Sequence, residues 1–172
     1  MSATSPLARI PVGVVVERRK AASPWIEFTW HPIAVLPGRQ EAAPWSALSS
    51  DATAATYYVG PCEIELYRTE TGSYRHNLAS ALPSLWIVLR PTGDDPPFAL
   101  QTVTADPAEG ESYTQAGSDL VGAVPMPAAI RQMVDEFVVR HHVEQSFHKR
   151  KREPADPGAV PRPRTTGRRQ AQ

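Results

Sequence analysis

Apolar and polar residues alternate along much of the first two thirds of the chain, which is typical of β-strands with one buried face. In Ile10–Lys20, an isoleucine and three valines recur at every second position. Trp25–Val35 alternates in the same way until Pro32, which cannot donate a ladder hydrogen bond, so an edge or bulged strand is predicted there. Leu85–Arg90 is a continuous apolar run between two prolines and predicts a central strand covered on both faces.

Three further strands follow from the same pattern. Thr56–Arg68 and Phe98–Thr104 each alternate over most of their length. Between them, Glu70–Ser73 contains a glycine and predicts a hairpin connection, after which Tyr74–Leu78 returns antiparallel. The stretches 39–53 and 106–124 show no steady period, so we expect loops there, with short helical turns at most.

The period changes near the C-terminus, where apolar residues recur every three or four positions after Pro127, a residue suited to a first helical turn. This spacing predicts an amphipathic helix over Pro127–Lys149. The fold expected is therefore α+β: one domain over residues 8–150, with a small antiparallel sheet or open barrel of about six strands and one long C-terminal helix. The residues of the apolar stripe are Ile130, Met133, Val134, Phe137, Val138 and His141.

Charge is divided unevenly, although 18 basic and 18 acidic residues give the 172-residue chain no formal net charge. Residues 1–148 hold 10 basic and 16 acidic side chains, whereas residues 149–172 hold 8 and 2. Residues 151–172 are rich in proline and arginine and have almost nothing apolar to bury, which predicts a disordered basic tail. Such a tail can contact phosphates, dock on an acidic protein or simply solubilise, and no base-reading fold favours nucleic acid. Its basic residues, with those that lead into it, are Lys149, Arg150, Lys151, Arg152, Arg162, Arg164, Arg168 and Arg169.

Neither an export signal nor an apolar run approaching the roughly 20 residues of a membrane span is present, so a cytoplasmic protein is expected. The single cysteine, Cys62, excludes an internal disulfide and any multi-cysteine metal site within one chain. Cys62 alternates with Ile64 and Leu66, which favours a small buried core residue over a thiol nucleophile.

Catalytic chemistry has no support in the sequence, because a glycine-rich phosphate loop and a Gly-x-Ser-x-Gly elbow are both missing. We therefore expect no enzymatic activity and no cofactor. The weak metal candidates are His141, Glu144 and His148, whose spacing allows them to share one helical face. A solvated helix end, where histidine favours the negative end of the helix dipole, explains this group without a metal.

The segment from Trp25 to Pro32 is rich in aromatic residues and is the best candidate for a recognition surface. Alternation predicts Phe28 and Trp30 to lie in the core, whereas Trp25 lies beside a turn and is the better exposed anchor. The predicted partner-binding residues are Trp25, His31, Arg18 and Arg19.

Several short motifs together resemble an uncharacterised bacterial family, domain of unknown function 3305. Its genes commonly lie beside those of molybdenum-dependent formate dehydrogenase and its accessory proteins. The resemblance covers about residues 8–152 and is carried by Pro11–Arg19, Ser23–Trp25, Trp30 with Pro32, Val35–Gly38, Tyr67–Tyr74 with Asn77 and Leu78, Pro83–Arg90, Met126–Pro127 and Lys149–Arg152.

The resemblance implies a cytoplasmic accessory protein for making, loading or assembling a molybdopterin enzyme. Its partner would be a formate dehydrogenase subunit or a molybdenum cofactor protein. Some relatives bear the name of the guanylyltransferase of molybdenum cofactor synthesis, but this chain lacks the N-terminal glycine-rich nucleotide loop of that enzyme. Two alternatives remain: a nucleic-acid-binding or regulatory adapter that acts through the basic tail, and an enzyme of molybdenum cofactor biosynthesis.

Overall fold

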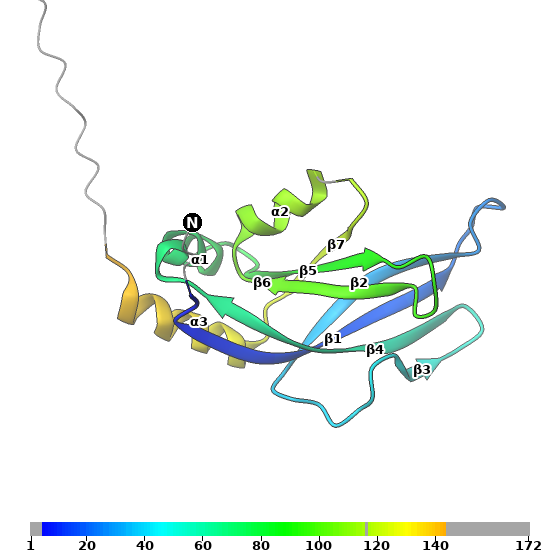
Figure 1. The fold of residues 1–172 in the computed structure, drawn as a ribbon, viewed down its shortest axis with the longest axis horizontal. Coiled ribbons are helices and arrows are strands. Elements are labelled where there is room, and N and C mark those ends of the chain that lie inside the picture. The colour runs from blue at the N-terminus through cyan, green and yellow to red at the C-terminus, as the bar shows by residue number, and fades with distance from the viewer. Residues whose placement is uncertain (1–4, 116, 144–172) are drawn as a thin grey trace, which may run out of the picture.

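The computed structural model describes residues 5–115 and 117–143 and shows an α+β fold, as predicted (Figure 1). Two antiparallel sheets pack together without forming a closed barrel. The strands are β1 (Ala8–Lys20), β2 (Phe28–Pro37), β3 (Ser46–Ser50), β4 (Ala54–Leu66), β5 (Ser84–Pro91), β6 (Phe98–Thr104) and β7 (Leu120–Pro125). The helices are a 3-10 turn at Arg68–Glu70, α1 (Thr71–Leu78), α2 (Pro107–Gln115) and α3 (Ala128–His141).

One sheet has the strand order β2-β1-β4-β3 and the other β6-β5-β7. β2 is an edge strand and carries a bulge, because its pairing with β1 skips Ile33, so both features predicted from Pro32 are confirmed. Strand β6 lies along β4, and β7 lies along β2. The second contact is very close: a Cβ added to Gly122 of β7 would lie 2.8 Å from Cγ of Pro32.

The hydrophobic core lies between the sheets and is closed at one end by α3. β5 is covered on both faces, as its continuous apolar run predicted, because α2 packs on its other side. That packing needs a glycine: a Cβ added to Gly110 of α2 would lie 2.3 Å from Cγ of Trp86. The most deeply buried core residues include Val12, Val14 and Val16 of β1, Ile64 and Leu66 of β4, Leu85, Ile87 and Leu89 of β5, and Ile130 and Val134 of α3.

The hairpin predicted over residues 70–78 is wrong, because this segment forms α1. Thr71, Tyr74 and Asn77 are buried at a spacing of three residues, which is a helical and not a strand period. The backbone N–H of Tyr67 donates to the Tyr74 hydroxyl at 3.1 Å and so fixes the start of the helix. The glycine that suggested a turn has no positive φ and lies inside the helix.

Two strands lie in segments predicted to be loops. β3 pairs with β4, and β7 pairs with β5, although both are short and have no clear alternation. Their neighbours in the sheets determine their conformation, since strand propensity depends strongly on tertiary context. Helix α2 lies in a segment where only short turns were expected.

The C-terminal helix is shorter than predicted. α3 ends at His141, and the next residue, His142, has extended backbone angles of φ −72° and ψ 126°. Residues 144–149, which the prediction included, lie outside the described residues. Met133 of the predicted apolar stripe is 47% exposed. In the part of the chain that the structure describes, no helix is both long and apolar enough to span a membrane.

Candidate partner-binding site

The hairpin of β1 and β2 ends in a structured turn over residues 21–27, which projects from the body of the molecule (Figure 1). The backbone N–H of Ala21 donates to the carbonyl of Glu27 at 2.9 Å, and the N–H of Trp25 donates to the Ser23 hydroxyl at 3.3 Å. Trp25 is 91% exposed, and its neighbour Ile26 is 55% exposed. The turn therefore presents a large aromatic side chain to solvent, as its place beside a turn predicted.

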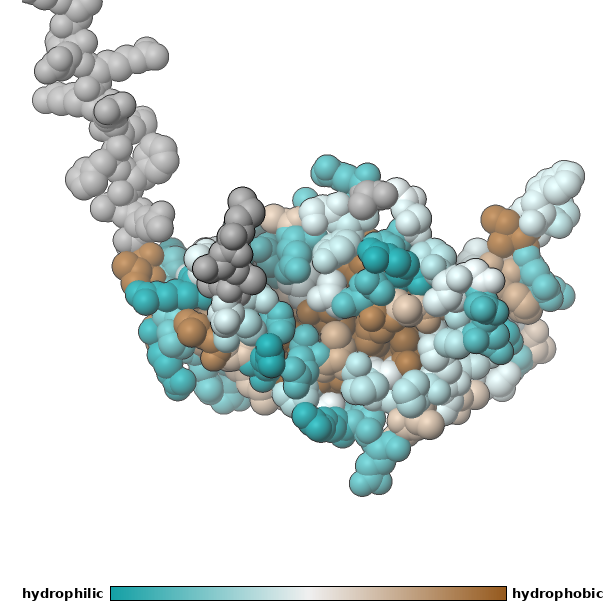
Figure 2. Space-filling model, viewed as in Figure 1, coloured by the Kyte–Doolittle hydropathy of each residue, from teal (hydrophilic) through white to brown (hydrophobic). Residues whose placement is uncertain are grey.

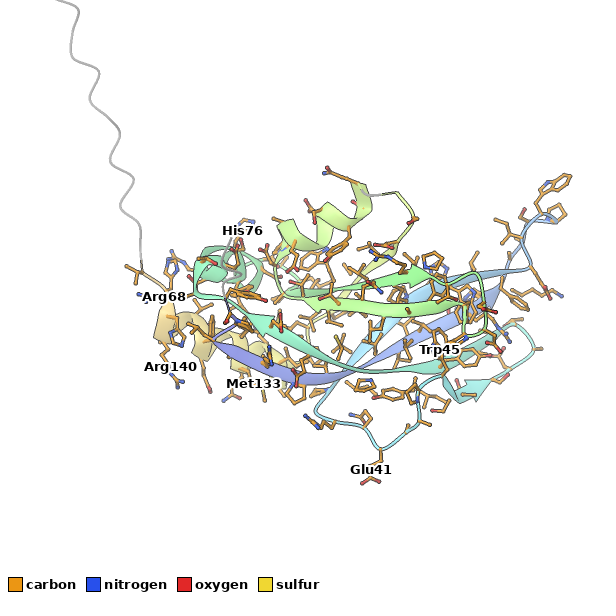
Figure 3. The ribbon with its side chains drawn as sticks, viewed as in Figure 1. Glu41, Trp45, Arg68, His76, Met133 and Arg140 are labelled. Atoms are coloured by element: carbon orange, nitrogen blue, oxygen red, sulfur yellow. The ribbon has the colours of Figure 1, made fainter. Side chains whose placement is uncertain are left out.

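Next to this turn, five half-buried rings form an aromatic cluster where the two sheets meet. The ring centroid of Trp30 lies 5.9 Å from Trp45, 5.8 Å from Tyr57 and 5.8 Å from Phe98. Figure 3 shows Trp45 at the end of the molecule from which the hairpin turn projects. The members of the aromatic cluster are Phe28, Trp30, Trp45, Tyr57 and Phe98.

The cluster revises the prediction for β2. Trp30 packs against the hydrophobic core but is only partly buried, and Phe28 lies outside the core cluster. Both rings therefore retain surface that a partner could cover. The sequence did not indicate Trp45, Tyr57 or Phe98, because they come from distant segments that only the fold brings together.

The guanidinium of Arg18 lies over this cluster. Its central carbon is 4.4 Å from the ring centroid of Phe28, 5.4 Å from Tyr57 and 5.9 Å from Trp30. These distances are those of cation–π contacts, which hold an arginine with its plane against apolar surface. Arg18 also lines an open groove of about 300 Å³, together with Lys20, Glu27, Phe28 and residues 50–55.

Strand alternation separates the four predicted partner-binding residues. Arg18 pairs with Trp30 in the register and shares its face, whereas Arg19 and His31 lie on the opposite face. Arg19 is held there by Glu17, with 2.9 Å between its Nη2 and the carboxylate. Of these four residues, Arg18 contacts the aromatic cluster, and Trp25 lies on the turn that joins β1 to β2.

A second, larger hollow of about 710 Å³ lies between β4 and β6 and is lined mostly by polar and charged residues. In Figure 2, hydrophobic residues are visible in the middle of the face. Cys62 lines the hollow, is half-buried and packs against the hydrophobic core, so the prediction of a small buried core residue is confirmed in part. Burial is the main factor that raises the pKa of its thiol, which keeps the thiol protonated and a poor nucleophile at neutral pH. Beside it, Arg9 forms ion pairs with Glu65 at 3.2 Å and with Glu63 at 3.8 Å.

The predicted metal candidates are only partly placed. The ring of His141 packs on Phe137 at 4.6 Å between centroids, at the end of α3. Glu144, His148 and all the basic residues of the tail lie outside the described residues. Within residues 5–115 and 117–143, no group of three or more His, Cys, Asp or Glu side chains could hold a metal ion.

Two glycines, Gly13 and Gly117, have structural roles and do not form a phosphate loop. Gly13 lies within β1, and a Cβ added there would be 2.6 Å from Cε2 of Tyr58, so the tyrosine ring packs directly on the strand. Gly117 has φ +98° in the turn before β7 and precedes a strand, not a helix. Neither glycine leads into the helix N-terminus that a nucleotide phosphate needs.

The family described as "Protein of unknown function (DUF3305)" matches residues 11–151, which is most of the chain. No curated protein and no solved structure shows significant similarity to the chain.

Proposed function

Because this chain belongs to the DUF3305 family and displays a Trp on a structured turn, we propose that it is a non-enzymatic accessory protein that binds a protein partner. The partner we propose is a subunit or cofactor protein of a molybdenum-dependent formate dehydrogenase, during its maturation or assembly. The binding surface is the hairpin turn, residues 21–27, together with the aromatic cluster.

The exposure of Trp25 is the observation that carries this proposal. Tryptophan is among the side chains most enriched at the energetic centres of interfaces. Covering a Trp removes on the order of 200 Å² from water, which contributes about 5 kcal/mol before the costs of association. The hydrogen bonds of Ala21 and Trp25 order the turn in advance, so less conformational entropy is lost on binding.

The choice of partner rests on the family resemblance, because genes of related proteins commonly lie beside those of formate dehydrogenase. An assembly factor acts through a binding surface and needs no catalytic group. A protonated Cys62 thiol, which is a poor nucleophile, agrees with such a role. This role also agrees with the positions of Gly13 and Gly117, which rule out a phosphate loop at either glycine.

Affinity purification from cells that produce formate dehydrogenase tests the proposal. The tagged wild-type chain, Trp25→Ala and the control Val139→Ala would be compared; Val139 is 78% exposed on α3, away from the hairpin. We expect dehydrogenase subunits or molybdenum cofactor proteins with the wild type and the control, and at least tenfold less with Trp25→Ala. No enrichment with the wild type would refute the function, and equal recovery with Trp25→Ala would refute the surface.

A further inference from the structure

Arg18 is a half-buried cation that no described residue neutralises. Its guanidinium has no hydrogen bond or ion pair with residues 5–115 or 117–143, although three aromatic rings lie within 5.9 Å. By contrast, four other arginines, Arg9, Arg19, Arg39 and Arg90, form ion pairs with carboxylates. Arginine that is withdrawn from water is usually paired with an acid.

The acids nearest in the groove do not fill this role. Oδ1 of Asp51 accepts hydrogen bonds from the Thr53 N–H at 2.7 Å, the Thr53 hydroxyl at 2.9 Å and the Ala54 N–H at 2.8 Å. These bonds tie the carboxylate to its own turn. Glu27 lines the same groove, as Lys20 does, but forms no ion pair with Arg18.

The rings beneath Arg18 prepare it to receive an anion. Contact with Phe28 and Tyr57 holds the guanidinium over the rings, and its N–H groups make no hydrogen bond to the described residues. A carboxylate can accept two parallel hydrogen bonds from the edge of a guanidinium. The apolar rings also exclude water from one side, which strengthens the electrostatic attraction.

We propose that Arg18 binds the carboxylate of an acidic side chain in a partner protein, next to an apolar or aromatic residue that packs on Phe28, Trp30 and Tyr57. This inference rests on the proposed function and specifies the chemistry of the partner. A protein segment fits this site because partly exposed rings adjoin the cation, and because the exposed side chains of Trp25 and Ile26 directly precede Glu27, which lines the groove.

The test uses the purified full-length chain and nuclear magnetic resonance of its arginine Nε–Hε groups, with the tryptophan indole N–H signals as the readout in variants that lack Arg18. The probe is a capped pentapeptide with a single glutamate between leucine and tryptophan; its glutamine counterpart and sodium acetate serve as comparisons. We expect millimolar binding that shifts the Arg18 signal, and binding at least tenfold weaker for the glutamine peptide.

Two arginines that are adjacent in sequence provide matched variants. Arg18→Gln should weaken binding of the glutamate peptide at least tenfold, and Arg18→Lys, which keeps the charge but loses the planar fork, at least threefold. Arg19→Gln, on the opposite face, should change it less than twofold. Unchanged urea midpoints would show that the variants are folded. If Arg18→Gln does not fold, the peptide affinity of Arg18→Lys decides the test.

Three results would overturn the inference: no shift of Arg18 at 20 mM peptide, equal binding of the glutamine peptide, or an unchanged affinity in both Arg18 variants. If acetate bound as tightly as the peptide, the ligand of Arg18 would be a small carboxylate and not a protein segment, which would also overturn the inference. The outcome does not depend on affinity purification. Peptide binding without recovery of dehydrogenase subunits would refute the proposed function alone, and the reverse result would refute the role of Arg18 alone.

Discussion

Replacing Asn77 with alanine should destabilise the fold more than any exposed substitution on the same helix. Asn77 lies on α1 and is 3% exposed. Its Nδ2 donates to the carbonyls of Ser84 and Ala105, both at 2.8 Å, and its Oδ1 accepts from the Ser84 N–H at 3.0 Å. One side chain therefore joins α1 to the start of β5 and to the residue that follows β6.

The expected magnitude follows from the groups left without partners. The Ala105 carbonyl is buried, so its loss costs roughly 1–3 kcal/mol of desolvation without compensation. The two groups of Ser84 are only partly buried and can recover hydrogen bonds to water, which lowers their cost to roughly 0.5–1 kcal/mol each. We expect Asn77→Ala to lower the free energy of unfolding by about 3 kcal/mol, a large fraction of the roughly 5–15 kcal/mol usual for a domain.

Urea unfolding followed by tryptophan fluorescence measures this difference in the free energy of unfolding. An equal slope of that free energy against urea concentration in wild type and variant would confirm that only stability has changed. His76→Ala is the control, because His76 is the preceding residue of α1 and is exposed (Figure 3). The control should change the free energy by less than about 0.5 kcal/mol. If Asn77→Ala lost less than about 1 kcal/mol, the buried carbonyl would have another partner, and the reasoning would be refuted.

Three further predictions follow from particular contacts. Alanine usually stabilises a helix by about 1 kcal/mol relative to glycine. Gly72→Ala should therefore raise the melting temperature, because no atom lies within 4 Å of the new Cβ, whereas Gly110→Ala should lower it, because the new Cβ would lie 2.3 Å from the indole of Trp86. Shifts of the same sign would contradict the packing of α2. Iodoacetamide should modify Cys62 slowly at pH 7 and faster as the pH approaches the raised pKa of the thiol, and rapid labelling at pH 7 would contradict the burial. Arg90 donates two hydrogen bonds to Asp119 and lowers the pKa of the Asp119 carboxyl. The pair therefore stabilises the fold above the unfolded-state pKa near 4, and this contribution is lost as the pH falls through the lower folded-state pKa. Asp119→Asn should remove this pH dependence from urea midpoints measured between pH 2 and 6, and an unchanged profile would contradict the prediction.

How far the sequence predicts the fold depends on whether burial in each segment has a regular period. β1 and β5 were predictable because alternating or continuous apolar residues match their buried faces. The segment 70–78 was misread because Gly72 suggested a turn, although Tyr74 and Asn77 already had helical spacing. β3 contains three serines and an alanine among its five residues, so only its pairing with β4 makes it a strand.

The candidate site was predictable only where local sequence determines exposure. The turn residues before Trp25 indicated that it would be exposed, and its surroundings confirm this. Strand period also places Arg18 and Arg19 on opposite faces, a distinction that their grouping as one candidate surface overlooked. The partnership of Trp45, Tyr57 and Phe98 has no local signal, because long-range packing brings β4, β6 and the residue before β3 to Trp30 of β2.

The close approach of Gly122 to Pro32 has a consequence for how sequences with this fold can diverge. A side chain at position 122 would overlap the pyrrolidine ring at position 32, so the larger residue can be accommodated only if the ring is lost or β7 moves outward. Substitutions at these two positions should therefore be coupled, with Gly122→Ala tolerated better when position 32 carries glycine than when it carries proline. In an alignment of related chains, this contact would appear as a covarying pair far apart in sequence, and it would mark where β7 of one sheet packs on β2 of the other.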